Sequence, residues 1–184
     1  MDATIKDAED RMKKSVAALE DELAGLRTGR ASAAMFDKLR VQYYGTPTPL
    51  NQVASISVPE SRLVVIQPWD KGALPEIEKA IQTSEMSLNP SNDGKVIRIN
   101  IPPLTEERRK EIVKIAKNTA EQGRVAVRNI RRDANDDLKK LEKESEISED
   151  DLKRGEDQIQ KLTDQYIDQI NTVLSAKESE ILEI

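Results

Sequence analysis

The placement of proline is the feature that most constrains the fold of this chain. All eight prolines lie between Pro47 and Pro103, whereas residues 1–46 and 104–184 contain none. Proline interrupts a helix because it lacks a backbone N–H and its ring clashes with the preceding turn. Long uninterrupted helices are therefore possible at both ends of the chain, and the segment between them must fold in another way.

Both proline-free ends carry apolar residues at intervals of three and four, which is the spacing of one helix face. In the N-terminal stretch these residues run from Ile5 to Leu26, and we expect that helix to end at Thr28–Gly29, since glycine favours the position after a helix. The C-terminal end carries two such stretches, from Ile112 to Leu141 and from Leu152 to Ile181. Three amphipathic helices with narrow apolar stripes predict an antiparallel three-helix bundle.

Helix start signals precede both C-terminal stretches. Thr105 follows Pro102–Pro103–Leu104 and can cap a helix whose first residues are acidic. Ser148 and Asp151 resemble a capping box, with Asp in place of Glu. These signals predict a turn between the second and third helices near residue 145.

The middle segment changes to an alternating pattern that is typical of strands. We expect strands at 39–43, 53–58, 62–67 and 95–101, turns at 59–61 and 92–94, a loop at 45–50 and a short helix at 74–84. The predicted fold class is α+β: a discontinuous bundle of residues 1–29 and 105–184, with a small β-rich α/β domain inserted at 30–104. Two connectors near 29–31 and 102–105 would form a hinge. The expected hinge residues are Gly29, Arg30, Pro102, Pro103 and Leu104.

Composition argues against bond-making chemistry. The chain has no Cys and no His, so the usual thiol nucleophile, general base and zinc ligands are missing. It has no glycine-rich phosphate loop, and its carboxylates alternate with Lys and Arg as on a solvated helix face. We therefore expect a protein that is not an enzyme and binds no cofactor, metal or small-molecule substrate. The charged N-terminus and the lack of long apolar runs predict a soluble cytoplasmic protein with no membrane contact.

One stretch breaks the even mixture of charges. Residues 122–132 contain several arginines and no acidic residue, although the net charge of the chain is −5. Arg124, Arg128 and Arg131 are spaced four and three apart and so share one row, with Arg132 on its flank. Such a row suits contacts to phosphates, and Arg27 and Arg30 could extend it. The alternative is that these arginines pair with Asp or Glu of the neighbouring helices.

Longer motifs are similar to those of one family. They are Leu26–Ala31 (LRTGRA), Tyr43–Leu50 (YYGTPTPL), Pro102–Lys110 (PPLTEERRK) and Arg124–Ala134 (RVAVRNIRRDA). Through them the chain resembles the bacterial ribosome recycling factor family along essentially its whole length. The resemblance implies an L-shaped, hinged protein, expected to be a monomer, with a three-helix bundle and a smaller α/β domain.

The resemblance also implies a function. The chain would bind the post-termination ribosome, contact ribosomal RNA of the large subunit through its bundle and, with elongation factor G and GTP, split the ribosome into subunits and release it from mRNA. Elongation factor G, which would push on the smaller domain, hydrolyses the GTP. The residues implied to face RNA are Arg27, Arg30, Arg124, Arg128, Arg131 and Arg132. The alternatives are a helical scaffold that does not bind ribosomes and, with little support, an acid/base hydrolase.

Overall fold

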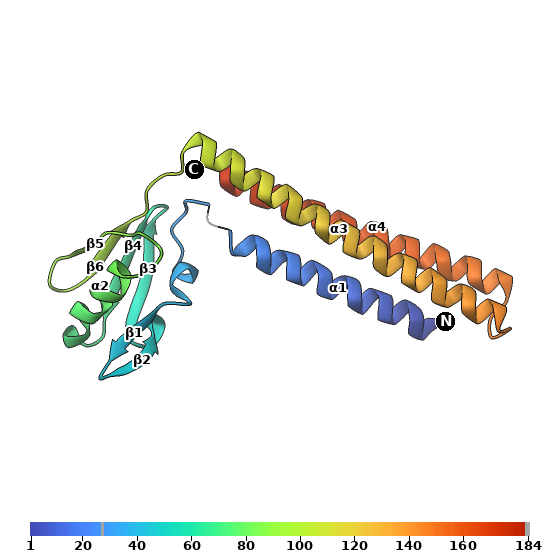
Figure 1. Ribbon diagram of the computed structural model, residues 1–184, viewed down its shortest axis with the longest axis horizontal. Coiled ribbons are helices and arrows are strands. Elements are labelled where there is room, and N and C mark those ends of the chain that lie inside the picture. Colours follow the sequence, from blue (N-terminus) through green and yellow to red (C-terminus); the bar gives the residue numbers. More distant parts are fainter. Residues whose placement is uncertain (27, 183–184) are drawn as a thin grey trace. The chain divides into compact units, whose positions relative to one another are not determined.

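The computed structural model describes residues 1–26 and 28–182, which form two compact units. The larger unit comprises residues 1–28 and 106–183, and the smaller unit comprises Gly29–Thr105. Figure 1 shows long helices in the first unit, and short strands and short helices in the second. None of the described helices is both long enough and apolar enough to cross a membrane.

The larger unit is a bundle of α1 (Asp2–Ala24), α3 (Glu106–Lys143) and α4 (Glu149–Leu182). All three helices pack against one another, and α3 turns back into α4 at its C-terminal end (Figure 1). Their apolar stripes meet in one core, in which Met12, Leu138, Ile159 and Ile170 are fully buried. The predicted stripes are therefore the faces that the bundle buries.

Glycine permits close helix packing inside the bundle. A Cβ on Gly155 of α4 would lie 2.9 Å from Leu138 Cδ1 of α3. A Cβ on Gly123 of α3 would lie 3.3 Å from Leu19 Cδ2 of α1. Both positions belong to the predicted apolar stripes, where the absence of a side chain lets a leucine of the neighbouring helix approach.

The start of α4 confirms the predicted capping box. The Asp151 N–H donates to Ser148 Oγ (3.1 Å), and the Ser148 N–H donates to Asp151 Oδ2 (3.3 Å). These bonds, together with an ion pair to Arg154, hold the pKa of Asp151 below its usual range, with the backbone bond from Ser148 as the largest cause. The turn before the cap places Ser145 in the left-handed region at φ 59°.

The predicted end of the first helix was wrong. α1 ends at Ala24 rather than at Thr28–Gly29, and Gly25 is its C-cap, with an N–H that donates to Asp21 O (3.1 Å). Gly25 does not need a left-handed conformation to end the helix, because its φ is −74°. Gly29 does adopt that conformation, at φ 78°, but further along the chain.

The smaller unit contains two antiparallel sheets. A two-stranded sheet pairs β1 (Arg40–Tyr43) with β2 (Thr46–Pro49). A four-stranded sheet has the order β3-β4-β6-β5. Its strands are β3 (Ala54–Glu60), β4 (Leu63–Pro68), β6 (Ile97–Asn100) and β5 (Pro90–Asn92).

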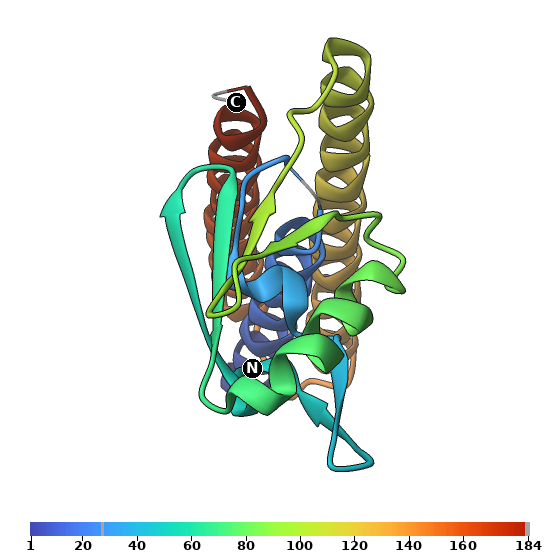
Figure 2. The ribbon, with the colours of Figure 1, turned by 90° about the vertical axis from the view of Figure 1, so that its left-hand side faces the viewer.

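Helices complete the core of this unit. Figure 2 looks onto it, with α2 (Leu74–Gln82) in green. The short 3₁₀ helices are η1 (Ala33–Phe36), η2 (Leu50–Gln52) and η3 (Lys71–Ala73). Phe36 of η1, Ile77 of α2, and Ile66 and Ile97 of the larger sheet meet in one buried cluster. The expected α+β fold, a bundle with a small antiparallel β domain, is thus confirmed.

Two strands lie where the sequence did not predict them. The expected loop at 45–50 contains β2, and Pro90–Asn92 forms β5. Proline is tolerated in β2 because this strand pairs on one side only, with β1. The turn between them, Tyr44–Gly45, has φ values of 49° and 77°, as a two-residue hairpin turn of type I′ requires.

Both connectors of the smaller unit are fastened to the turn between β3 and β4. The Ala31 N–H donates to Ser61 O, and the Ile101 N–H donates to Arg62 O, each at 2.7 Å. Gly29 also lies against Leu104, since a Cβ on Gly29 would be 2.8 Å from Leu104 Cγ. The two segments therefore leave the smaller unit side by side.

Candidate nucleic-acid interface

The predicted arginine row lies on α3. We use the term arginine row for Arg124, Arg128 and Arg131, which follow one another along one side of this helix. The Arg124 side chain is 20% exposed and that of Arg128 is 41% exposed, while Arg131 is half-buried. Between them Val127 and Ile130 point into the bundle core. The row therefore lies beside the face of α3 that packs in the bundle core.

Glu121 joins two members of the row. Its Oε2 accepts from Arg124 Nη1 at 2.9 Å, and its Oε1 accepts from Arg128 Nη1 at 3.3 Å. These two hydrogen bonds, that from Arg124 first, lower the pKa of Glu121 below its ordinary value. Glu121 was not predicted as part of the site, because it lies immediately before the acid-free stretch. Its spacing, three residues before Arg124, was the signal that could have revealed it.

Amides of α4 contact the row across the helix interface. Arg124 Nε donates to Asn171 Oδ1 at 2.9 Å, and Arg131 Nη1 donates to Gln160 Oε1 at 3.3 Å. Gln160 in turn donates from Nε2 to Asp164 Oδ1 at 2.9 Å. The partners that α4 presents to Arg124 and Arg131 are therefore neutral amides, whereas the alternative had predicted carboxylates.

The remaining predicted arginines lie in different places. Arg132 is exposed on the flank of the row on α3. Arg30 is exposed and belongs to the smaller unit. Arg27 lies outside the described residues. Asp133, next to Arg132, forms a cross-helix ion pair with Arg11 of α1 at 3.2 Å.

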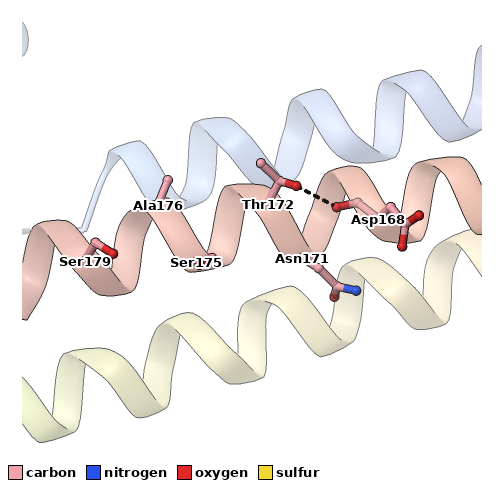
Figure 3. Close-up of a pocket in the computed structure, with 6 residues that line it drawn as sticks. All are labelled: Asp168, Asn171, Thr172, Ser175, Ala176 and Ser179. Carbon is pink, nitrogen blue, oxygen red and sulfur yellow. Dashed lines mark hydrogen bonds between the residues drawn. The ribbon is translucent and has the colours of Figure 1, made fainter.

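A shallow groove runs along α4 beside Asn171. Figure 3 shows its lining of mostly small side chains, with Asn171 directed toward α3 and Thr172 donating to the Asp168 carbonyl at 3.0 Å. The lining residues are Asp168, Asn171, Thr172, Ser175, Ala176 and Ser179. Because Asn171 also contacts Arg124, the groove borders one end of the arginine row.

The carboxylates give no sign of a metal site in the part of the chain that the structure describes. Among residues 1–26 and 28–182, no group of three acidic residues is arranged to hold a metal ion. Asp136 and Asp137 are exposed on α3. The arginine row with Arg132 is, by contrast, a surface suited to a polyanion.

Comparison with known proteins identifies the family. The family model described as "Ribosome recycling factor" matches residues 19–182. The chain belongs to the ribosome recycling factor family. It is 58% identical over 184 residues to the ribosome-recycling factor of Oleidesulfovibrio alaskensis, which covers 100% of both chains. It is 64% identical over 178 residues to that of Treponema denticola, covering 97% of this chain and 96% of that protein.

Solved structures agree with this family. The fold is similar to a solution structure of the ribosome recycling factor, with a TM-score of 0.77, 49% identity, and coverage of 100% of this chain and 97% of that one. It is also similar, with a TM-score of 0.65, 52% identity and 98% coverage of both chains, to a structure of the T. thermophilus ribosome recycling factor and the E. coli elongation factor G bound to the E. coli post-termination complex. The resemblance drawn from the sequence motifs is thus confirmed, and the chain is a translation factor rather than an enzyme.

Proposed function

We propose that this chain binds the post-termination ribosome through the arginine row and Arg132, and acts with elongation factor G to separate the subunits for reuse. Family membership and the similarity to a recycling factor bound to the post-termination complex support the reaction. The arginine row supports the mode of binding, because planar guanidinium groups at fixed spacing suit bidentate contacts to RNA phosphates. Arg27 and Arg30 would add further contacts to RNA.

The single observation that carries this proposal is the kind of partner the arginines have. An arginine that serves only to join helices is expected to pair with a carboxylate of the neighbouring helix. Here α4 offers Asn171 and Gln160, which accept hydrogen bonds without cancelling the charge. Among the described residues, Glu121 is the one carboxylate that pairs with Arg124 and Arg128, so the row and Arg132 keep a local excess of positive charge on a chain with a net charge of −5. This arrangement supports a specific polyanion contact on one face.

The connectors support a second part of the proposal, a hinge at residues 29–31 and 102–105. Thr28 is buried and donates to Glu180 Oε1 of α4 at 3.1 Å, which fastens the connector to the bundle. On the other side, Ala31 and Ile101 are fastened to the β3–β4 turn. The segments left between these anchors, Gly29–Arg30 and Pro102–Leu104, are the ones that can absorb a change of backbone angles. Elongation factor G, which hydrolyses the GTP, would act on the smaller unit.

Co-sedimentation with ribosomes at several salt concentrations tests the RNA contact. We expect Arg131→Ala to lower ribosome affinity and to reduce the slope of log affinity against log salt by about 0.7–0.9, the change for one lost phosphate contact. Its melting temperature should stay close to that of the unchanged protein, because the apolar stripe is untouched. Arg154→Ala, which removes an exposed arginine outside the row, is the control and should bind normally.

Two results would contradict the proposal. One is wild-type binding by Arg131→Ala, Arg128→Ala and Arg124→Ala together with lowered melting temperatures, which is what a purely structural role predicts. The other is equal weakening by Arg154→Ala, which would show that any positive charge on the bundle contributes. A helical scaffold that does not bind ribosomes would show no co-sedimentation at any salt concentration.

A further inference from the structure

The side chains of α4 that touch the arginine row differ in kind from their neighbours. Gln160 and Asn171 contact Arg131 and Arg124, whereas Asp164 and Asp168 lie between them on the same side of α4. Thus α4 presents an amide at each of the two positions that contact an arginine, and a carboxylate at the two positions between them. The two contacts run in opposite order along α3 and α4, as the antiparallel packing of these helices requires.

We infer that Asn171 and Gln160 are positioning residues for RNA binding, which hold Arg124 and Arg131 in fixed directions without adding a carboxylate partner to either. This inference rests on the proposed function. It extends the interface from α3 to α4 and assigns a role to two exposed polar residues that carry no charge of their own.

The physical reason lies in the flexibility of arginine. A free arginine side chain samples many rotamers, and binding a phosphate through it requires that this freedom be lost. A hydrogen bond from Arg124 Nε to Asn171 fixes the plane of the guanidinium group before RNA arrives. Preorganised groups bind more tightly because less ordering is left to binding.

The amide has a second consequence. A carboxylate in the same place would also orient the guanidinium group, but it would reduce the positive charge that attracts phosphate. Glu121 illustrates this, since it orients Arg124 and Arg128 from α3 and shares its one negative charge between them. An acidic residue on α4 as well would leave Arg124 with two carboxylate partners. The amide therefore allows orientation without further neutralisation.

Gln160 is itself oriented. Its Nε2 donates to Asp164 Oδ1 at 2.9 Å, so its Oε1 is the atom that faces Arg131 Nη1. Without Asp164, the side-chain amide could present either its oxygen or its NH₂ group to the row, and only the oxygen can accept from arginine. Asp164, one helical turn after Gln160, thus fixes the orientation in which the Gln160 oxygen faces Arg131.

The test uses purified ribosomes and the full chain, with affinity measured by co-sedimentation over a range of salt concentrations. Asn171→Ala removes the acceptor, and we expect affinity to fall about two- to tenfold, the effect of one lost hydrogen bond, with an unchanged salt slope and melting temperature. Asn171→Asp keeps the acceptor and adds a charge, so affinity should also fall and the salt slope should become shallower. Gln160→Ala and Gln160→Glu should act on Arg131 in the same two ways.

A double-mutant cycle separates positioning from direct binding. If Asn171 acts through Arg124, Asn171→Ala should have no further effect on affinity in a chain that already carries Arg124→Ala. The matched control for Gln160→Glu is Gln165→Glu. It makes the same chemical change on another side of α4, and the variant should bind ribosomes like the unchanged protein.

The inference is overturned if Asn171→Ala and Gln160→Ala bind like the unchanged protein while Arg124→Ala and Arg131→Ala bind weakly. It is also overturned if Asn171→Ala and Arg124→Ala have additive effects, or if Gln165→Glu weakens binding as much as Gln160→Glu does. If Arg124→Ala and Arg131→Ala themselves bind normally, the proposed function fails first. The two failures are therefore distinguishable.

Discussion

In the bundle, the core side chains come from helices of 23, 34 and 38 residues, whereas in the smaller unit they come from strands and helices of at most nine residues and from the loops that join them. Helical hydrogen bonds are local, so each bundle helix is built from contacts between neighbouring turns. The strands of the smaller unit must find partners that are distant in sequence, such as β6 for β4. A row of arginines at fixed spacing therefore suits the bundle better than the smaller unit, because a long helix holds its side chains at regular intervals.

The largest loss of stability is expected from a change in the core of the smaller unit. Ile97 is fully buried on β6, between β4 and β5. Ile97→Ala should cost this unit about 2–5 kcal/mol, the usual range for a buried isoleucine. Hydrogen exchange should then show faster exchange of the β4 and β6 amides, with the α3 amides near Val127 unchanged. Equal loss of protection in both units would contradict the expectation that the effect is confined to the smaller unit.

Glycines in the bundle allow a matched pair of changes. Gly155→Val should destabilise the bundle by about 1–3 kcal/mol, because even a Cβ would lie 2.9 Å from Leu138 Cδ1. Gly25→Ala should stabilise it by about 0.4–1 kcal/mol, since Gly25 has ordinary helical angles and a Cβ there would come no closer than 3.5 Å, to Glu22 O, which is an ordinary contact. Denaturant unfolding measures both. The same sign for both changes would mean that helix propensity, rather than close packing, decides the effect at Gly155.

Removing the N-terminal cap of α4 should cause a smaller loss of stability, confined to the bundle. Ser148→Ala removes the hydroxyl that accepts from the Asp151 N–H, and should cost about 1 kcal/mol of unfolding free energy. Ser148→Asp keeps an acceptor and should restore most of the loss. Thermal unfolding followed by the circular dichroism signal of the helices measures the change. Equal instability of both variants would argue against the capping role.

A pH effect confined to the smaller unit is the smallest that we predict. Backbone N–H groups of Val96 and Lys95, and then Arg98, lower the pKa of Asp93 to about 2 from its ordinary value of 3.8. Because the folded pKa is lower than the unfolded one, the stabilisation is present above about pH 4 and is lost as the pH falls toward about 2. Asp93→Asn should flatten this acid dependence, as measured by thermal unfolding of the smaller unit. If the acid dependence of stability is unchanged in Asp93→Asn, it arises from other carboxylates.

The helices could be predicted from sequence because their signals are local. Ser148 and Asp151 marked the start of α4 within three residues, and the spacing of Ile112 to Leu141 marked the buried side of α3. The end of α1 was predicted at the wrong glycine. Gly29 follows the apolar stripe, whereas Gly25 lies before its last residue, Leu26, and only the hydrogen bond from the Gly25 N–H to Asp21 O marks Gly25 as the cap.

Non-local contacts explain what could not be predicted. β2 and β5 are short and contain proline, so they become strands only because β1 and β6 pair with them. The arginine row was visible in the sequence, but its partners Asn171 and Gln160 depend on the register between α3 and α4. That register is set by packing of the bundle core rather than by the residues around each arginine.

The most direct test of the account is light scattering by post-termination ribosomes after addition of this chain, elongation factor G and GTP, separately and together, with Arg131→Ala in parallel. The account predicts a fall in scattering, from subunit separation, only when all three are present. It also predicts a slower fall with Arg131→Ala that recovers at higher protein concentration. Unchanged scattering with all three present, or full activity of Arg131→Ala together with reduced thermal stability, would contradict it.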